Sequence, residues 1–220
     1  MYEVNDRLDL THLGVGPLFI EHGLLEERAD DAVVTEANTH LQMTSGIAGS
    51  LRKAGGIDIH KEAITRGPLP VGHVARTSAG KLPARRLYHA VLIDFFIGRG
   101  MSAKVITAIV ADLLAFAEED EAHTLAMPLF GGGGGLKASI ALPAIIEGLE
   151  EAGRLPGQGP TLTLVVRDAE EFALVQRLAG ELKAKGARRA EENEVAADFL
   201  AELMGGMGDI GDLSDFSFEE

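Results

Sequence analysis

The sequence predicts a domain of the α/β class, with a mixed, largely parallel sheet that helices cover on both faces. Two observations lead to this fold class. Short β-rich runs alternate with segments of helical periodicity, in the order β-α-β-β-α-β-α-β-α. Most of the β-rich runs are also continuously apolar, which is typical of strands that are buried on both faces.

The predicted strands are five short runs that are rich in β-branched and other apolar residues. They are DAVVTEAN (31–38), GHVARTSA (72–79), RLYHAVLIDF (86–95), HTLAMPL (123–129) and PTLTLVVRD (160–168). We expect the segments near 32–36, 86–94, 124–127 and 161–166 to lie in a single sheet.

Helical periods separate several of these strands. A short helix is expected from about Gly46, after the first strand, and another contains Ile140 and Ile145. Ser102 is suited to cap a helix whose apolar stripe consists of Val105, Ile109, Leu113 and Phe116. The segment DAEEFALVQRLAGELKA (168–184) repeats this pattern with Phe172, Val175, Leu178 and Leu182.

Length and composition describe an ordinary globular protein. The 220 residues suit one α/β domain with an appendage, and 46% of them are hydrophobic and 25% charged. The absence of cysteine excludes disulfides and a thiolate nucleophile, and it fits a reducing, cytoplasmic setting. The N-terminus MYEVNDRLDL lacks the pattern of a signal peptide, and no apolar run is long enough to span a bilayer, so we expect neither export nor membrane insertion.

The charge of the chain is negative and unevenly distributed. Its net charge of −14 argues against a nucleic-acid partner, because such a protein needs clustered Lys and Arg on one face. Residues 185–220 carry three basic and ten acidic groups, so they hold half of the net charge. This change in composition predicts a boundary between a domain over residues 1–184 and an acidic tail over 185–220.

The tail alternates single apolar residues with acidic ones. A helix is expected to about Leu203, with a narrow apolar stripe of Val195, Phe199 and Leu203. The remainder is expected to be flexible in isolation. The pattern in residues 195–218 is typical of a short motif for a basic, grooved protein partner or a second subunit, and equally of a solvated acidic tail without a partner.

Two glycine-rich loops follow predicted strands. The loop LQMTSGIAGSLRKAGG (41–56) comes after the strand at 32–36, and the loop with five consecutive glycines (131–135) comes after the strand at 124–127. Both lie at the carboxyl ends of strands and close to helix N-termini, where unpaired backbone N–H groups bind anions in open α/β sheets. Each loop alone could be a connector, whereas two at one edge favour a phosphate site.

Three stretches resemble the macrodomain family, whose members bind ADP-ribose and in some cases hydrolyse ADP-ribosyl linkages. They are DAVVTEANTHLQMTSGIAGSLRKAGG (31–56), GPLPVGHVARTSAGKLPARRLYHAV (67–91) and LAMPLFGGGGGLKAS (125–139). The similarity spans roughly residues 18–183. It implies a three-layer α/β/α sandwich with the ligand lying across the strand ends.

The departures from the family pattern bear on function. The family aspartate that holds the adenine amino group is replaced by Leu24, and the aspartate that orients water in hydrolytic members is replaced by Ala48. The second loop is one residue shorter than usual and lacks the aromatic residue that commonly covers the distal ribose. Asn38 matches the asparagine that contacts this ribose, and Phe172 matches an aromatic that stacks on adenine.

The resemblance therefore implies a set of ligand-binding residues on the two loops and beside them. They are Leu24, Asn38, Thr44, Ser45, Gly46, Ile47, Ala48, Gly49, Phe130, Gly131, Gly132, Gly133, Gly134, Gly135 and Phe172. Four of them have structural alternatives: Asn38 could hydrogen-bond turn backbone, Phe172 could pack in the core, and Thr44 and Ser45 could merely shape the turn.

Three functions stay open, and we favour non-hydrolytic binding of ADP-ribose, an ADP-ribosylated molecule or a related nucleotide diphosphate. The alternatives are a hydrolase of ADP-ribosyl or O-acyl-ADP-ribose linkages in which the substrate's own phosphate positions water, and a scaffold without ligand. Neither loop offers a carboxylate, histidine or lysine as a general base before Lys53 and Lys137, so no catalytic residue is predicted. No cofactor is predicted, and the histidines lack the spacing of metal ligands.

Overall fold

The computed structural model describes residues 7–94, 101–131, 136–155 and 157–184 of the chain. The chain divides into two compact units, Met1–Ala179 and Gly180–Glu220. All the strands and the glycine-rich loops belong to the first unit, and the described part of the second unit, residues 180–184, is helical. The predicted motif at 195–218 lies outside the described residues.

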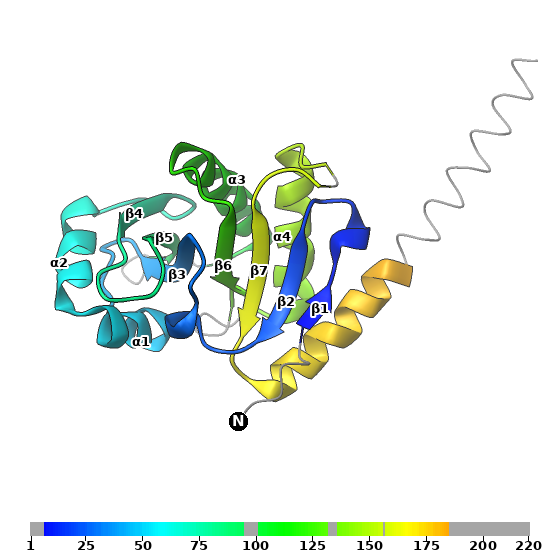
Figure 1. Cartoon of the computed structure of the whole chain (residues 1–220), viewed down its shortest axis with the longest axis horizontal. Coiled ribbons are helices and arrows are strands. Elements are labelled where there is room, and N and C mark those ends of the chain that lie inside the picture. The colour runs from blue at the N-terminus through cyan, green and yellow to red at the C-terminus, as the bar shows by residue number, and fades with distance from the viewer. Residues whose placement is uncertain (1–6, 95–100, 132–135, 156, 185–220) are drawn as a thin grey trace, which may run out of the picture. The chain divides into compact units, whose positions relative to one another are not determined.

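The first unit contains a seven-stranded sheet in the order β1-β2-β7-β6-β3-β5-β4 (Figure 1). The four inner pairings, β2 with β7, β7 with β6, β6 with β3 and β3 with β5, are parallel, and the two outer pairings are antiparallel. The predicted mixed, largely parallel sheet is therefore confirmed. Its strands are β1 Arg7–Asp9, β2 Leu18–His22, β3 Ala32–Asn38, β4 Val74–Ser78, β5 Arg86–Ile93, β6 Thr124–Pro128 and β7 Thr161–Val166.

Four labelled α-helices accompany the sheet: α1 Gly46–Gly55, α2 Ile57–Arg66, α3 Ala103–Glu119 and α4 Ala138–Glu151. A further helix begins at residue 169 and continues to residue 184, the last one described. Short 3-10 turns lie at Thr11–Leu13 (η1) and Leu25–Glu27 (η2). As predicted, Ser102 caps α3, because its Oγ accepts a hydrogen bond of 3.4 Å from the backbone N–H of Val105.

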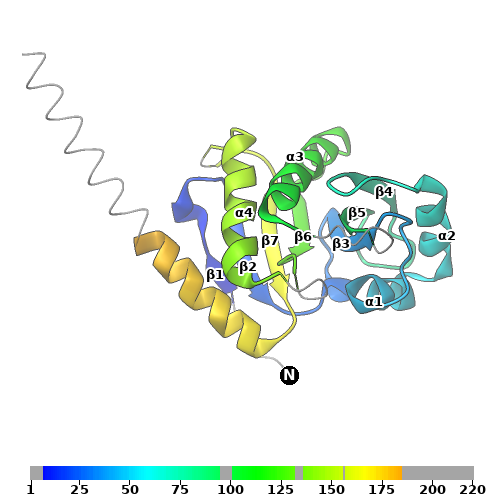
Figure 2. The same ribbon diagram turned by 180° about the vertical axis from the view of Figure 1, so that it is seen from behind.

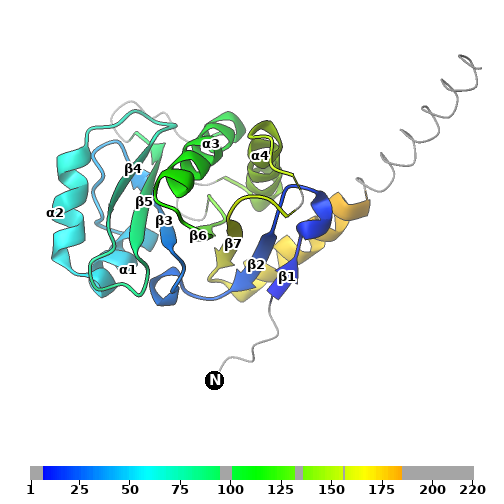
Figure 3. The same cartoon turned by 45° about the horizontal axis from the view of Figure 1, so that its top comes forward.

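Helices cover both faces of the sheet. Alternate residues of β3 and β5, such as Val33 and Leu87, pack with Leu51 of α1 and Ile59 of α2 in one apolar cluster. The neighbouring residue Tyr88 points to the other face, where its hydroxyl lies 3.1 Å from the carbonyl oxygen of Phe116 in α3. Figures 2 and 3 show α3 and α4 side by side on this second face. These layers confirm the α/β/α sandwich.

Two parts of the predicted element order were incomplete. The sheet begins with β1 and β2, which the periodicity did not reveal because they are short and lie in a segment without clear alternation. The single helix expected from Gly46 is two helices, since the chain turns at Gly56 with a φ of +97°.

In the described residues, no helix is both long and apolar enough to cross a membrane.

Candidate functional site

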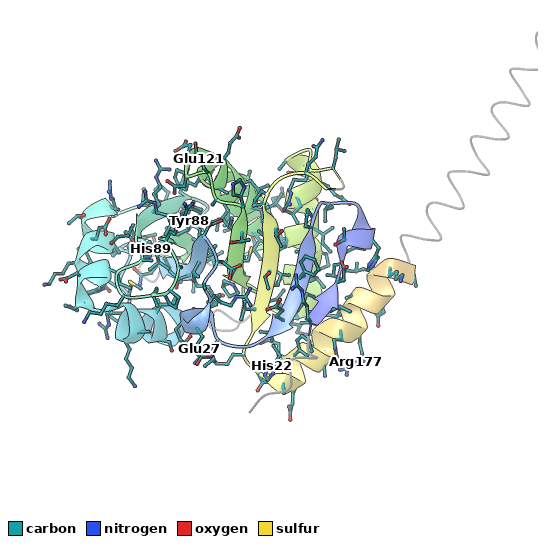
Figure 4. The ribbon with its side chains drawn as sticks, viewed as in Figure 1. His22, Glu27, Tyr88, His89, Glu121 and Arg177 are labelled. Carbon is teal, nitrogen blue, oxygen red and sulfur yellow. The ribbon has the colours of Figure 1, made fainter. Side chains whose placement is uncertain are left out.

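The carboxyl ends of the parallel strands lie at one edge of the sheet and border a groove. Figure 4 shows His22 and Glu27 at this edge and Glu121 at the opposite one. The groove consists of a larger cavity of 390 Å³ and a smaller one of 110 Å³, which share Glu36, Gly46 and Ile47 in their walls. This placement agrees with the rule that open α/β sheets bind ligands beyond the carboxyl ends of their strands.

The larger cavity extends from β3 and α1 across to the end of β7. Its walls come from the turn after β2, the ends of β3, β6 and β7, and the start of the helix at 169–184. The lining residues are Gly23, Leu25, Glu26, Glu36, Gly46, Ile47, Pro128, Leu129, Val165, Val166, Arg167, Asp168 and Glu171.

The smaller cavity lies between the end of β3 and the first glycine-rich loop. It is lined by Glu36, Ala37, Asn38, Gln42, Thr44, Ser45, Gly46, Ile47, Ala48 and Ile93. Six predicted site residues therefore meet here, namely Asn38, Thr44, Ser45, Gly46, Ile47 and Ala48. Gly49 lies one residue further along α1 and is not part of either wall.

The N-terminus of α1 opens onto this cavity. Ser45 is the N-cap residue, but its side chain makes no capping hydrogen bond and is exposed. Gly46 has a φ of +58°, a conformation that favours glycine, and a β-carbon there would meet open space. Because the first N–H groups of a helix have no intrahelical acceptor, this end of α1 is suited to an anion.

The second glycine-rich loop begins beside the groove. The ring of Phe130 is fully buried, so a ligand in the groove could approach its backbone but not its ring. Gly131 has a φ of +136°, and a β-carbon there would lie 2.4 Å from the carbonyl oxygen of Leu136. Glycine is therefore required at 131. The other predicted residues of this loop, Gly132, Gly133, Gly134 and Gly135, lie outside the described residues.

Glu36, near the end of β3, connects the two cavities. Its Oε1 accepts a hydrogen bond of 2.8 Å from the backbone N–H of Gly131. Burial raises the pKa of the Glu36 carboxyl above its ordinary value, the hydrogen bond from Gly131 lowers it, and the nearby charge of Glu171 raises it further; the net direction is upward. The groove thus contains a half-buried carboxyl group that is predisposed to bind a proton.

The far end of the larger cavity is acidic. Arg167 pairs with Glu26 across 2.5 Å, and the second carboxylate oxygen of Glu26 is buried without a hydrogen-bond partner. Asp168 accepts a hydrogen bond of 2.9 Å from the backbone N–H of Glu171, as an N-cap does. Burial, together with the charge of Asp168, raises the pKa of Glu171. Arg167 is the single cation among the described lining residues.

Asn38 is occupied by the turn that follows β3. Its Oδ1 accepts hydrogen bonds from the backbone N–H groups of His40 (3.0 Å) and Gln42 (3.3 Å), and its Nδ2 donates to the carbonyl of Gln42 (3.2 Å). The structural alternative for Asn38 thus accounts for these three contacts, although the side chain also lines the smaller cavity.

The remaining predicted residues lie beside the groove. Leu24 precedes η2 and is absent from both walls, whereas its neighbours Gly23 and Leu25 line the larger cavity. The Phe172 side chain is buried, and its ring centroid lies 5.9 Å from that of His22. Phe172 therefore packs in the core of the described structure, which was the structural alternative for this residue.

Sequence reasoning missed the acidic residues of the groove. It assigned no role to Glu36, and it overlooked Glu26, Arg167, Asp168 and Glu171. The available signal was the run VVRDAEE, which places charges directly after a buried strand at the ligand-binding edge of the sheet.

Within the described ranges, no three or more His, Asp or Glu side chains are grouped so as to hold a metal ion.

Comparison with known sequences identifies a family profile and several relatives. The profile of the Macro domain matches residues 34–150. An uncharacterised protein of Aeropyrum pernix is 36% identical over 163 residues, which cover 72% of this chain and 82% of that protein. An uncharacterised protein of Mycobacterium tuberculosis is 35% identical over 105 residues, but the match covers 48% of this chain and 29% of that protein. The chain thus matches less than a third of the mycobacterial relative.

Solved structures share the fold. The Oceanobacillus iheyensis macrodomain with ADP is 21% identical with a TM-score of 0.63, and the match covers 84% of this chain and 96% of that chain. The Trypanosoma brucei macrodomain in complex with ADP-ribose is 21% identical with a TM-score of 0.60, covering 74% and 72% of the two chains.

Proposed function

Because this chain belongs to the macro domain family, we propose that its groove binds ADP-ribose or a molecule that carries it. The observation that carries the proposal is the exposed N-terminus of α1 at the carboxyl ends of the parallel strands, in the first glycine-rich loop and beside Glu36, which contacts Gly131 at the start of the second. The Trypanosoma brucei macrodomain was solved with ADP-ribose and the Oceanobacillus iheyensis macrodomain with ADP, and both ligands contain a nucleotide diphosphate.

In this proposal the diphosphate lies against the start of α1. The backbone N–H groups of Gly46 and Ile47 and the free hydroxyl of Ser45 supply donors there, and the positive end of the helix dipole adds to the attraction. The ribose and base then occupy the larger cavity, where Leu25, Val165 and Val166 offer apolar surface.

The groove favours binding over hydrolysis. Ala48, at the position of the family's water-orienting aspartate, carries no group that could activate water. One observation keeps the hydrolase as a second candidate: Glu36 places a carboxyl group in the groove, which is the kind of general base that the loops themselves lack.

Two measurements test this function on the full chain. Isothermal titration with ADP-ribose should show saturable binding, and its absence would leave only the ligand-free scaffold. Incubation with an ADP-ribosylated protein should release no free ADP-ribose above background. Release that is lost in Glu36→Gln would instead establish the hydrolase, with Glu36 as its base.

A further inference from the structure

We propose that Glu36 sets the charge selectivity of the groove: its ionised carboxylate opposes a diphosphate, and its protonated form admits one. This inference rests on the proposed function, since it concerns the same groove. It goes further in making occupancy depend on a single side chain that neither loop contributes.

Glu36 belongs to the walls of both cavities, together with Gly46 and Ile47 at the start of α1. A diphosphate held by the N–H groups of these two residues therefore shares the groove with the Glu36 carboxyl group. Like charges in so confined a space repel each other more strongly than in bulk water, because the surrounding protein is less polarisable.

The hydrogen bond from Gly131 occupies a donor beside the groove. A backbone N–H at the start of the second glycine-rich loop is a donor that an anionic ligand could use, but in this structure Oε1 of Glu36 already accepts it, at 2.8 Å. The carboxylate thus stands where a phosphate oxygen would otherwise bind. A ligand has to displace it or to leave this donor unused.

The described walls of the groove contain no unpaired cation that could neutralise Glu36. The charged groups that line the larger cavity with Glu36 are Asp168 and Glu171 near the start of the helix at 169–184, and Glu26 with its partner Arg167. The described lining residues of α1, of the end of β6 and of the segment after it, namely Gly46, Ile47, Pro128 and Leu129, carry no charge. Among the described lining residues, the one cation is therefore paired with Glu26, and the other charged groups are carboxylates.

Protonation of Glu36 removes its repulsion of a diphosphate. Burial already raises the pKa of Glu36 in the free protein, and two phosphate charges brought beside it would raise the pKa further. Binding then takes up a proton at any pH between the free and the bound pKa. The affinity for a diphosphate rises as the pH falls through this interval and levels off below the pKa of the free protein.

ADP-ribose is a suitable probe, because each phosphate of its diphosphate keeps one charge between pH 5 and 8. Titration calorimetry over this range, repeated in buffers of different ionisation enthalpy, measures both the affinity and the protons taken up. The variants are Glu36→Gln, which keeps an acceptor for Gly131 without the charge, and Glu36→Ala, which frees the N–H. Glu147→Gln, exposed on α4, is the matched control for net charge.

We expect the native chain and Glu147→Gln to take up a proton and to bind more tightly at low pH. Glu36→Gln should take up none and should bind about tenfold more tightly at pH 7.5, the size expected when a like charge is removed from a partly solvated groove. Glu36→Ala should behave in the same way, and circular dichroism shows that each variant is folded.

Two results would overturn the proposed role of Glu36, and they can be told apart. If the native chain binds ADP-ribose and both Glu36 variants bind no more tightly, or still take up a proton, the selectivity role of Glu36 is wrong while the proposed function stands. If no variant binds ADP-ribose at any pH, the proposed function fails and this inference fails with it.

Discussion

The carboxylate of Glu36 accepts a hydrogen bond of 2.8 Å from the backbone N–H of Gly131, and this contact ties the end of β3 to the second glycine-rich loop. Glu36 belongs to β3, and Gly131 lies three residues after the end of β6, the direct neighbour of β3 in the sheet. The hydrogen bond fixes where this loop leaves the sheet, and hence one side of the groove.

Gly131→Ala should destabilise the protein by at least about 1–2 kcal/mol, the cost of a left-handed conformation for a residue with a β-carbon. The φ of +136° and the 2.4 Å approach to the Leu136 carbonyl both oppose the new methyl group. Urea unfolding measures the change. Gly180→Ala is the control, because its β-carbon would meet nothing within 4 Å and its helical position favours alanine. Equal stability of the two variants would contradict the prediction.

Ser45 and Ser102 are both N-cap residues, but only Ser102 makes a capping hydrogen bond with its side chain. Ser102→Ala should therefore cost about 1 kcal/mol of stability and leave ADP-ribose affinity unchanged, since Ser102 lines neither cavity. Ser45→Ala should have the opposite effects. Its free energy of unfolding should change little, and it should bind ADP-ribose about fivefold more weakly because one hydrogen bond is lost. Unfolding curves and calorimetry together test this pair. A Ser45→Ala protein that is unstable but binds normally would show that Ser45 serves the helix alone.

Much of the fold could be predicted because buried parallel strands leave a strong signal. The continuous apolar runs at 86–94 and 161–166 correspond to β5 and β7, and the alternation of strands and helices gave the sheet type. β2 was missed, since its five residues, LFIEH, offer too short a pattern to separate from a loop.

The site was harder to predict, because side-chain direction at a strand end is not set by periodicity. The register of β3 against β5 shifts between Ala37 and Asn38, so simple alternation fails beside Glu36. The ion pair of Glu26 with Arg167 joins residues that are far apart in the sequence, and only the parallel pairing of β2 with β7 brings them together. The binding of a ligand at these residues stays a prediction.

The buried His89 should make stability depend on pH. Thr77 donates its hydroxyl proton to the carbonyl of Ser78 (3.0 Å), so its Oγ1 accepts from Nε2 of His89 at 2.9 Å. Nδ1 of His89 is then unprotonated, buried and without a hydrogen-bond partner. A second proton on the ring would have no acceptor, and burial lowers the pKa of His89 from 6.5 to about 4.

The lowered pKa of His89 determines whether stability rises or falls with pH. The unfolded chain binds a proton at His89 below about pH 6.5 and the folded chain only near pH 4, so stability falls as the pH falls through this window. The total loss is on the order of 3 kcal/mol. His89→Gln keeps a donor for Thr77 and should flatten this part of the curve in urea unfolding between pH 4 and 7. His12→Gln, at an exposed position, should leave this part of the curve unchanged. If His89→Gln does not change the slope of stability against pH, another group is responsible.

Arg167 should determine how well the acidic end of the groove tolerates an anionic ligand. Its guanidinium neutralises Glu26 across 2.5 Å, and the Glu26 side chain is only 19% exposed. Arg167→Gln leaves Glu26 as an uncompensated charge beside Asp168 and Glu171. We expect ADP-ribose to bind about tenfold more weakly, in line with the coupling of a partly buried charge to a nearby phosphate. Arg177→Gln removes the same charge from an exposed site outside the groove and should have little effect.

The double variant Glu26→Gln with Arg167→Gln tests whether Arg167 acts by neutralising Glu26 or by contacting the ligand directly. If the weaker binding of Arg167→Gln comes from the unpaired Glu26 carboxylate, removing that carboxylate should restore most of the affinity. If Arg167 instead contacts the ligand directly, the double variant should stay weak. Raising the salt concentration from 0.1 M to 1 M shortens the screening length from about 10 Å to about 3 Å, so it should also narrow the difference between the native chain and Arg167→Gln. A difference that is unchanged by salt and by the second substitution would show that the Glu26–Arg167 pair acts by holding the backbone after β7, not by neutralising charge.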